Sequence, residues 1–156
     1  MESHGRMVVE EMEFRFRHPV EVRFRDIDIG GHAHHGEALV YIEEGRSAYW
    51  RQVVGRAGLH DIDYILAEAH VRYHARVLWP DTLDVGVRVV RLGKKHFEMA
   101  YEVRSPERGR LVTASTVQVM FDYGAGVTKR IPDDMRARIE ELDGPFGLRH
   151  PETRSV

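Results

Sequence analysis

The sequence has no cysteine among its 156 residues. This absence excludes disulfide bonds, thiol catalysis and zinc sites built from cysteine. A chain of this length fits one domain, whose hydrophobic core is large enough to fold without a disulfide or a metal. We therefore expect its stability to come from packing rather than from cross-links.

Long apolar runs and a strong net charge are also missing. No run approaches the roughly 18 to 20 apolar residues of a membrane-spanning helix, and the first residues mix both charges without the apolar centre of a secretory signal. The formal net charge is only -2, although 31% of the residues are charged. This balance provides no general attraction for nucleic acid or an anionic membrane. We expect a cytoplasmic protein that binds neither of them.

Hydrophobic periodicity predicts most of the secondary structure. Apolar residues alternate over residues 19–26, which predicts a half-buried strand. Over residues 36–54 they recur at intervals of three and four, which predicts a long helix that is apolar on most sides. Four further strands are predicted at residues 65–77, 83–91, 97–104 and 111–122. A short helix that starts near Pro132 is predicted at residues 133–142.

The order of these elements predicts the fold class. One strand, a long helix and four consecutive strands indicate an antiparallel sheet wrapped around one helix, which is a two-layer α+β domain. We place this single domain at residues 14–143 and expect flexible termini at residues 1–13 and 144–156. Because exposed sheet edges need cover, we also expect a homodimer or homotetramer.

The stretch RDIDIGGHAHHGEALVYIEEGR, residues 25–46, carries dense ionisable chemistry. Asp26, Asp28 and three histidines precede the predicted helix. Such side chains can bind zinc, but no helical His-x3-His pair is present and the adjacent glycines indicate a turn, so we expect no metal. Asp28 is either part of an acid–base site or a turn residue that caps backbone amides. Asp26 should point to the other face of a continuing strand, and we expect it to be structural.

This stretch and the element order resemble the hot-dog fold, and more narrowly the 4-hydroxybenzoyl-CoA thioesterase family. That family has Asp-x-Asp at the end of a strand, a glycine-containing loop, a histidine or asparagine, and an aromatic-rich helix with Glu-x-x-Arg. The matching residues are Asp26-Ile27-Asp28, Gly30-Gly31, His35 and Glu43-Glu44-Gly45-Arg46. The resemblance extends loosely over residues 14–142. One departure is Ala38, where many relatives carry an aromatic residue near the acyl pocket, which suggests room for longer or bulkier acyl groups.

The resemblance implies the hydrolysis of an acyl-CoA thioester, with no cofactor beyond the coenzyme A of the substrate. Asp28 corresponds to the family's catalytic carboxylate, and His35 to a histidine that some members place near the thioester. In relatives, a backbone amide near the start of the second strand, often from the neighbouring subunit, also faces the thioester. Here that amide falls around Asp63 or Tyr64, and Tyr64 is our candidate.

Further residues are candidates for substrate binding. Gly31 allows close approach of the backbone, and Tyr41 near the helix start is a candidate for the acyl pocket. Coenzyme A carries phosphates, which need basic partners at the pocket mouth. The candidates lie at positions where relatives hold the nucleotide, and they are Lys94, Lys95, Lys129 and Arg130. The alternative is that these four are ordinary solvated residues of turns.

Thioester hydrolysis needs a base or nucleophile and donors for the developing oxyanion. Asp28 suits either role, since it could attack directly or deprotonate a water, and backbone amides at a helix start suit the donor role. Two alternatives remain open at this point. One is a hot-dog hydratase or dehydratase that acts on a 3-hydroxyacyl thioester, and the other is a non-catalytic acyl-CoA-binding protein.

Overall fold

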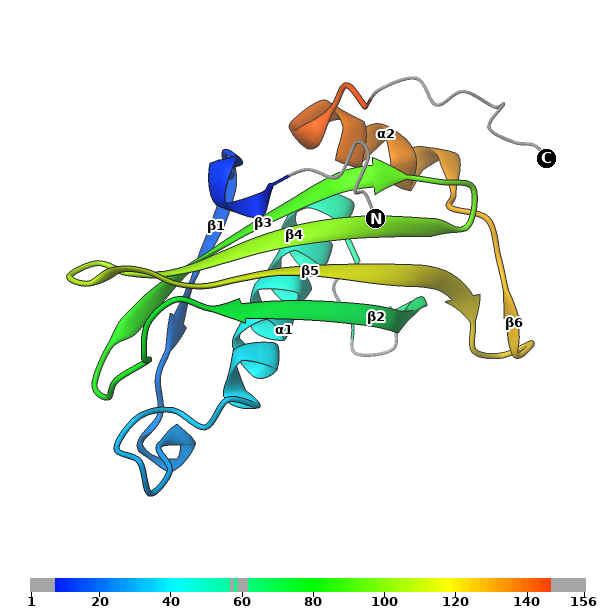
Figure 1. Ribbon diagram of the computed structural model, residues 1–156. Coiled ribbons are helices and arrows are strands. Elements are labelled where there is room, and N and C mark those ends of the chain that lie inside the picture. The colour runs from blue at the N-terminus through cyan, green and yellow to red at the C-terminus, as the bar shows by residue number, and fades with distance from the viewer. Residues whose placement is uncertain (1–7, 57, 59–61, 147–156) are drawn as a thin grey trace, which may run out of the picture.

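The computed structural model describes residues 8–56, 58 and 62–146. A curved sheet wraps around one long helix, and a second helix lies beside the sheet (Figure 1). The elements in chain order are η1 (Val9–Glu11), β1 (Phe16–Glu21), η2 (Phe24–Asp26), α1 (Glu37–Tyr49), η3 (Trp50–Val54), β2 (Tyr64–Tyr73), β3 (Thr82–Leu92), β4 (His96–Ser105), β5 (Gly109–Asp122), β6 (Val127–Thr128) and α2 (Asp133–Asp143).

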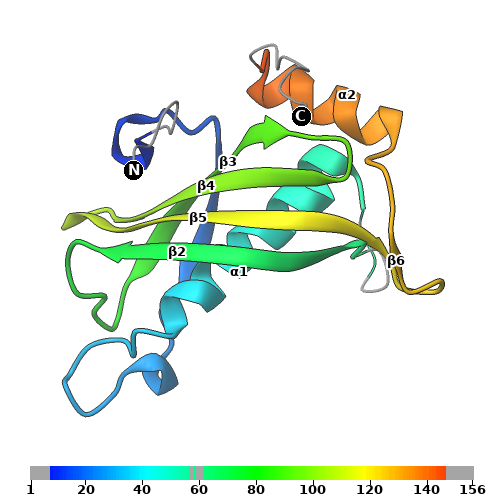
Figure 2. The same cartoon turned by 45° about the vertical axis from the view of Figure 1, so that its right-hand side comes forward.

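The sheet is antiparallel, with strand order β1-β3-β4-β5-β2 and the short β6 paired to β5. The strands β1 and β2 are therefore its two edges. A second view shows α1 against the concave face of the sheet (Figure 2). The predicted α+β class, with one sheet wrapped around one helix, is confirmed.

The long helix lies close against the sheet because its central contact is made by a glycine. The predicted helix at residues 36–54 is confirmed as α1 continued by the π-helical turn η3. A Cβ atom at Gly45 would lie 2.7 Å from Val85 Cγ1, so any side chain there would push the helix away. Val85, Val87 and Val89 have no exposed surface, and they form the floor beneath the helix.

The first strand differs from the prediction. It covers Phe16–Glu21 rather than residues 19–26, and the chain then bends into the turn η2. The Asp26 carboxylate accepts a hydrogen bond from the Arg23 backbone N–H at 2.9 Å, which stabilises this turn. Phe24, the last of the alternating apolar residues, is consequently 71% exposed. The alternating pattern thus holds only as far as Val22.

Both ends of the described chain are held against the sheet. Glu10 in η1 accepts a hydrogen bond from Thr113 Oγ1 at 2.8 Å, and its carbonyl accepts one from Arg110 at 2.7 Å. These contacts involve a segment that we predicted to be flexible. At the other end, the Asp143 carboxylate of α2 accepts hydrogen bonds from the Val89 N–H of β3 and from the Tyr49 hydroxyl of α1. None of the helices in the described part of the chain is sufficiently long and apolar for a membrane span.

Candidate active site

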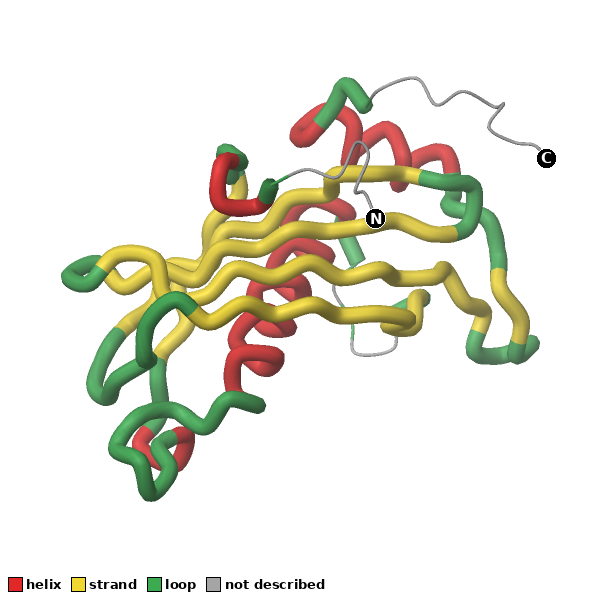
Figure 3. Tube along the Cα trace, in the orientation of Figure 1, coloured by secondary structure: helices red, strands yellow, loops and turns green. Residues whose placement is uncertain are grey.

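The loop between η2 and α1 extends beyond the sheet at the start of the helix (Figure 3). Asp28 lies in a tight turn of this loop. Its backbone carbonyl accepts a hydrogen bond from Gly31 N–H at 3.0 Å, and its Oδ1 accepts one from Gly30 N–H at 2.9 Å. Gly31 has a φ of +85°, which a residue with a side chain rarely adopts, so the paired glycines allow this turn. No hydrogen bond joins Asp28 Oδ2 to another described residue.

Asp26 anchors the same loop from inside the protein. Its side chain is 2% exposed, and Oδ2 accepts hydrogen bonds from Arg23 N–H at 2.9 Å and from the Tyr41 hydroxyl at 2.7 Å. Burial would raise the pKa of this carboxyl, but these hydrogen bonds and the Arg23 charge together hold the pKa below its ordinary value. The strand that we expected to orient Asp26 ends before this residue. The turn η2 positions the Asp26 side chain instead.

A cavity of about 370 Å³ opens between this loop and the end of β2. Three predicted site residues, Asp28, His35 and Tyr41, line it together. Apolar groups from Ala38 and Val112 form part of its wall, as an acyl group requires. The full lining is Asp28, His32, Ala33, His34, His35, Ala38, Tyr41, Tyr73, His74, Ala75, Arg76, Val77 and Val112.

The chain is tightly connected at the entry to α1. His34 Nδ1 accepts a hydrogen bond from Gly36 N–H at 3.0 Å, and the His34 and His35 rings lie 4.1 Å apart between centroids. Tyr73 at the end of β2 donates a hydrogen bond from its hydroxyl to the His35 carbonyl at 2.6 Å. A backbone carbonyl 38 residues away gives no sequence signal, so the role of Tyr73 was missed.

Comparison with known proteins identifies the family. The profile of the Thioesterase-like superfamily matches residues 22–139. The chain belongs to this superfamily. The predicted resemblance is therefore confirmed at the level of the superfamily. A search of curated proteins finds no significant match.

Solved structures of thioesterases share the superfamily fold. A thioesterase from Thermus thermophilus, crystallised with coenzyme A and Zn, is 31% identical with a TM-score of 0.76, over 85% of this chain and 96% of that one. A predicted thioesterase from Bacillus stearothermophilus is 20% identical with a TM-score of 0.76, over 85% and 98% of the two chains. A 1,4-dihydroxy-2-naphthoyl-CoA thioesterase from Synechocystis is 21% identical with a TM-score of 0.72, over 83% and 98%. The hot-dog fold is thus confirmed.

Gly31 lies in the Asp28 turn, although it is not part of the cavity lining. The other predicted site residues lie at the opposite end of the sheet. Tyr64 starts β2 and pairs with Met120, whereas Tyr73 ends β2 and pairs with Val112 beside the cavity. At about 3.3 Å per residue, the nine steps of β2 separate Tyr64 from Tyr73 by about 30 Å. The Tyr64 side chain is buried, and its hydroxyl accepts a hydrogen bond from Arg46 at 3.2 Å. Only its backbone could therefore face a substrate.

The four basic candidates lie at the Tyr64 end of the sheet. The Met120 N–H donates to the Lys95 carbonyl, and the Lys129 N–H donates to the Met120 carbonyl. Lys129 is 3.4 Å from Asp63, and Lys95 donates a hydrogen bond to Thr128. Within one chain, then, Lys94, Lys95, Lys129 and Arg130 do not join the cavity beside Asp28.

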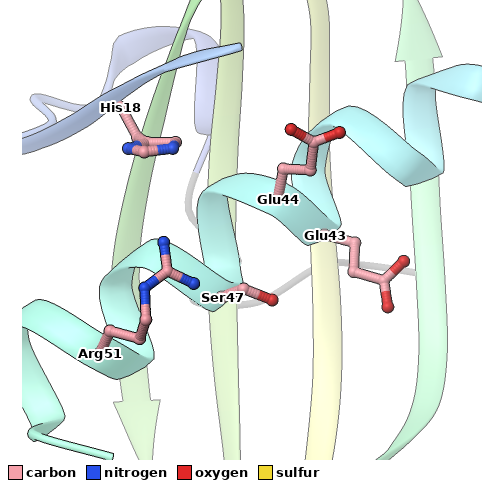
Figure 4. A pocket seen from close by; sticks show the side chains of 5 residues that line it. All are labelled: His18, Glu43, Glu44, Ser47 and Arg51. Carbon is pink, nitrogen blue, oxygen red and sulfur yellow. The ribbon is translucent and has the colours of Figure 1, made fainter. Parts of the chain in front are cut away.

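A second hollow, of about 260 Å³, lies between β1 and α1. Figure 4 shows His18 reaching from β1 toward the helix, and Arg51 extending from the helix toward His18. Glu43, Glu44 and Ser47 complete the lining. This wall contains no predicted site residue and no aliphatic or aromatic hydrocarbon side chain. The larger cavity beside Asp28 is therefore the better candidate for an acyl group.

The metal hypothesis can be tested against the arrangement of possible ligands. Within residues 8–56, 58 and 62–146, no group of three or more histidine and acidic side chains is arranged to hold a metal ion. In the loop itself, His34 Nδ1 and Asp28 Oδ1 already accept hydrogen bonds from backbone amides. Backbone amides of the chain thus already engage these two possible ligand atoms.

Proposed function

We propose that this superfamily member is an acyl-CoA thioesterase, which releases a free acid and coenzyme A, with Asp28 as general base or nucleophile. The observation that carries the proposal is the position of Asp28 on the wall of a partly apolar cavity, with Oδ2 unbonded among the described residues. This oxygen can accept a proton from an attacking water or attack the thioester carbon itself. The Gly30 amide holds Oδ1 and so orients the carboxylate.

The donors for the oxyanion are backbone amides at the cavity. Around the loop, the amides of Gly30, Gly31, Gly36 and Ala38 donate to oxygen or nitrogen atoms of the chain. The His35 N–H makes no such bond to a described residue, and it lies at the start of α1, where the helix dipole favours negative charge. We assign the His35 amide as one donor for the oxyanion, in addition to a role of its side chain in orienting water or substrate.

A second copy of the chain would complete the site. The edge strand β2 is exposed from Ile65 to His70, although the neighbouring β5 is largely buried. Antiparallel pairing of two β2 edges about a two-fold axis would bring the partner's Tyr64 end next to the Tyr73 end and its cavity. We therefore propose a homodimer in which the partner's Tyr64 amide faces the thioester.

The same pairing accounts for the distant basic residues. Lys94, Lys95, Lys129 and Arg130 of one subunit would come to the cavity mouth of the other, where the phosphates of coenzyme A need cations. The coenzyme A bound to the Thermus thioesterase supports this class of substrate. We propose that these four residues bind the nucleotide part across the dimer.

The experiment is a thiol-release assay of the purified full chain with a panel of acyl-CoA esters of increasing length. Hydrolysis of at least one ester, with free coenzyme A formed in equal amount to the acid, is the expected result. Crotonyl-CoA is included, and loss of its enoyl absorbance without thiol release would instead identify a hydratase. Tight binding of every ester without turnover would identify a non-catalytic acyl-CoA-binding protein.

A further inference from the structure

We propose that His34 and Tyr73 are positioning residues that together hold His35 at the cavity. This inference rests on the proposed thioesterase function, because it concerns the efficiency of the same site. His34 lies next to His35 in the loop, whereas Tyr73 reaches it from β2. The two contacts fix different parts of His35, its ring and its backbone.

His34 holds the ring of His35. Its Nδ1 accepts the Gly36 N–H at 3.0 Å, so Nδ1 carries no hydrogen and the remaining proton of the neutral ring lies on Nε2. The His34 ring is fixed by this bond, and the His35 ring lies against it at 4.1 Å and 32°. A Cβ atom at Gly36 would come within 3.1 Å of His34 Nδ1, so a side chain there would require the His34 ring to shift by a few tenths of an ångström.

Tyr73 holds the backbone of His35. Its hydroxyl donates to the His35 carbonyl at 2.6 Å, and this bond links β2 to the entry of α1 across the cavity, which both residues line. Burial raises the pKa of Tyr73, so the hydroxyl keeps the proton that it donates. The peptide between His35 and Gly36 is thus held at both ends, its carbonyl by Tyr73 and its N–H by His34.

The contacts with His34 and Tyr73 leave the reactive groups of His35 unoccupied. Neither ring nitrogen of His35 forms a hydrogen bond with another described residue, and the same holds for its backbone N–H. A residue that must direct a ring nitrogen or an amide at a thioester gains rate only when its geometry is maintained, since small displacements in an active site cost large factors. The structure therefore assigns the positioning to His34 and Tyr73 and leaves His35 free to contact substrate.

The test measures kcat and KM for the best acyl-CoA ester with the variants Tyr73→Phe and His34→Ala. Each removes contacts equivalent to about one hydrogen bond, so we expect kcat to fall about three- to ten-fold while KM changes less. Two control variants lie away from the cavity. Tyr49→Phe also loses a tyrosine hydrogen bond, to Asp143, and His18→Ala removes a histidine on β1; both should keep the parent kcat.

A double variant separates positioning from general structural damage. If His34 acts through the His35 ring, His34→Ala should have little further effect on kcat once His35→Ala has been introduced. Independent losses that multiply would overturn the role of His34. A second measurement, by NMR, needs no substrate. The carbonyl ¹³C resonance of His35 should shift in Tyr73→Phe, and the amide resonance of Gly36 should shift in His34→Ala.

The outcomes distinguish this inference from the function on which it rests. A parent protein that hydrolyses no acyl-CoA ester would overturn the proposed thioesterase. An active parent whose kcat is unchanged by both Tyr73→Phe and His34→Ala would overturn only the positioning roles of Tyr73 and His34. Loss of kcat in these variants together with the two resonance shifts would support them.

Discussion

Asp26 and Asp28 are two residues apart, yet they lie on opposite sides of one loop. Asp26 faces the interior, where Arg23 and the Tyr41 hydroxyl bond its carboxylate. Asp28 faces the cavity, where one oxygen is held by Gly30 and the other has no described partner. A carboxylate whose bonds are all made within the protein stabilises the fold, whereas one with an open oxygen at a cavity can act on a ligand. The tyrosine connects the two regions, because Tyr41 also lines the cavity.

The largest expected effect comes from the cavity side of the loop. Asp28→Asn keeps the size and the Gly30 contact but removes the basic oxygen, so we expect kcat/KM for acyl-CoA hydrolysis to fall at least about 100-fold. The free energy of unfolding should stay close to that of the parent, since no other described side chain bonds to Asp28. Steady-state kinetics and urea unfolding measure the two quantities. Parent-like rates would reject Asp28 as the reacting group.

The interior side of the loop should show the opposite signature. Asp26→Ala leaves Arg23 N–H and the Tyr41 hydroxyl without an acceptor, and we expect the free energy of unfolding to fall by about 3 kcal/mol. Tyr41→Phe removes only one partner of the same carboxylate and should cost about 1 kcal/mol. Urea unfolding measures both. A stable Asp26→Ala protein would contradict the anchoring role.

The cavity wall provides a third test of the comparison. Ala38 is 4% exposed and lines the cavity near Asp28. Ala38→Phe fills part of this space, so we expect kcat/KM to fall about ten-fold for the longest acyl group in the panel and less for acetyl-CoA. Competition between a long and a short ester measures the ratio. An unchanged ratio would show that the acyl group binds elsewhere.

Acid pH should weaken the interior side of the loop. Hydrogen bonds and Arg23 hold the pKa of Asp26 below its ordinary value, so this carboxylate stabilises the fold above the unfolded-state pKa of about 4, and that contribution is lost as the pH falls through the lower folded-state pKa. The stability difference between parent and Asp26→Asn should therefore shrink between pH 7 and pH 3. A difference that does not change with pH would contradict the pKa direction.

The elements that the sequence predicted well are those with a strong period. The helix at residues 36–54 and the strands that became β3, β4 and β5 lie within two residues of their predicted bounds, because each buries one continuous apolar face. The predicted end of β1 was wrong. The end of this strand depends on a hydrogen bond between the Asp26 carboxylate and the Arg23 amide, three residues away. Alternating residues cannot reveal that bond.

The candidate site likewise contains some residues that the sequence could bring together and others that it could not. Asp28, His35 and Tyr41 meet in one cavity because they lie within one loop and the first turns of one helix, so their proximity follows from a short stretch of sequence. Tyr73 joins them from β2 through a strand pairing that no local pattern encodes. The position of Tyr64 at the far end of β2 likewise depends on sheet register, and its proposed role requires a second subunit.

The most direct measurement is a crystal structure of the Asp28→Asn variant with an intact acyl-CoA ester bound. We predict that the thioester carbonyl lies in the cavity, with the side chain at position 28 either about 3.5 Å from its carbon or one bridging water away. An ester bound in the hollow between β1 and α1, or too far from position 28 for one water to bridge, would contradict the claim that Asp28 acts on the thioester.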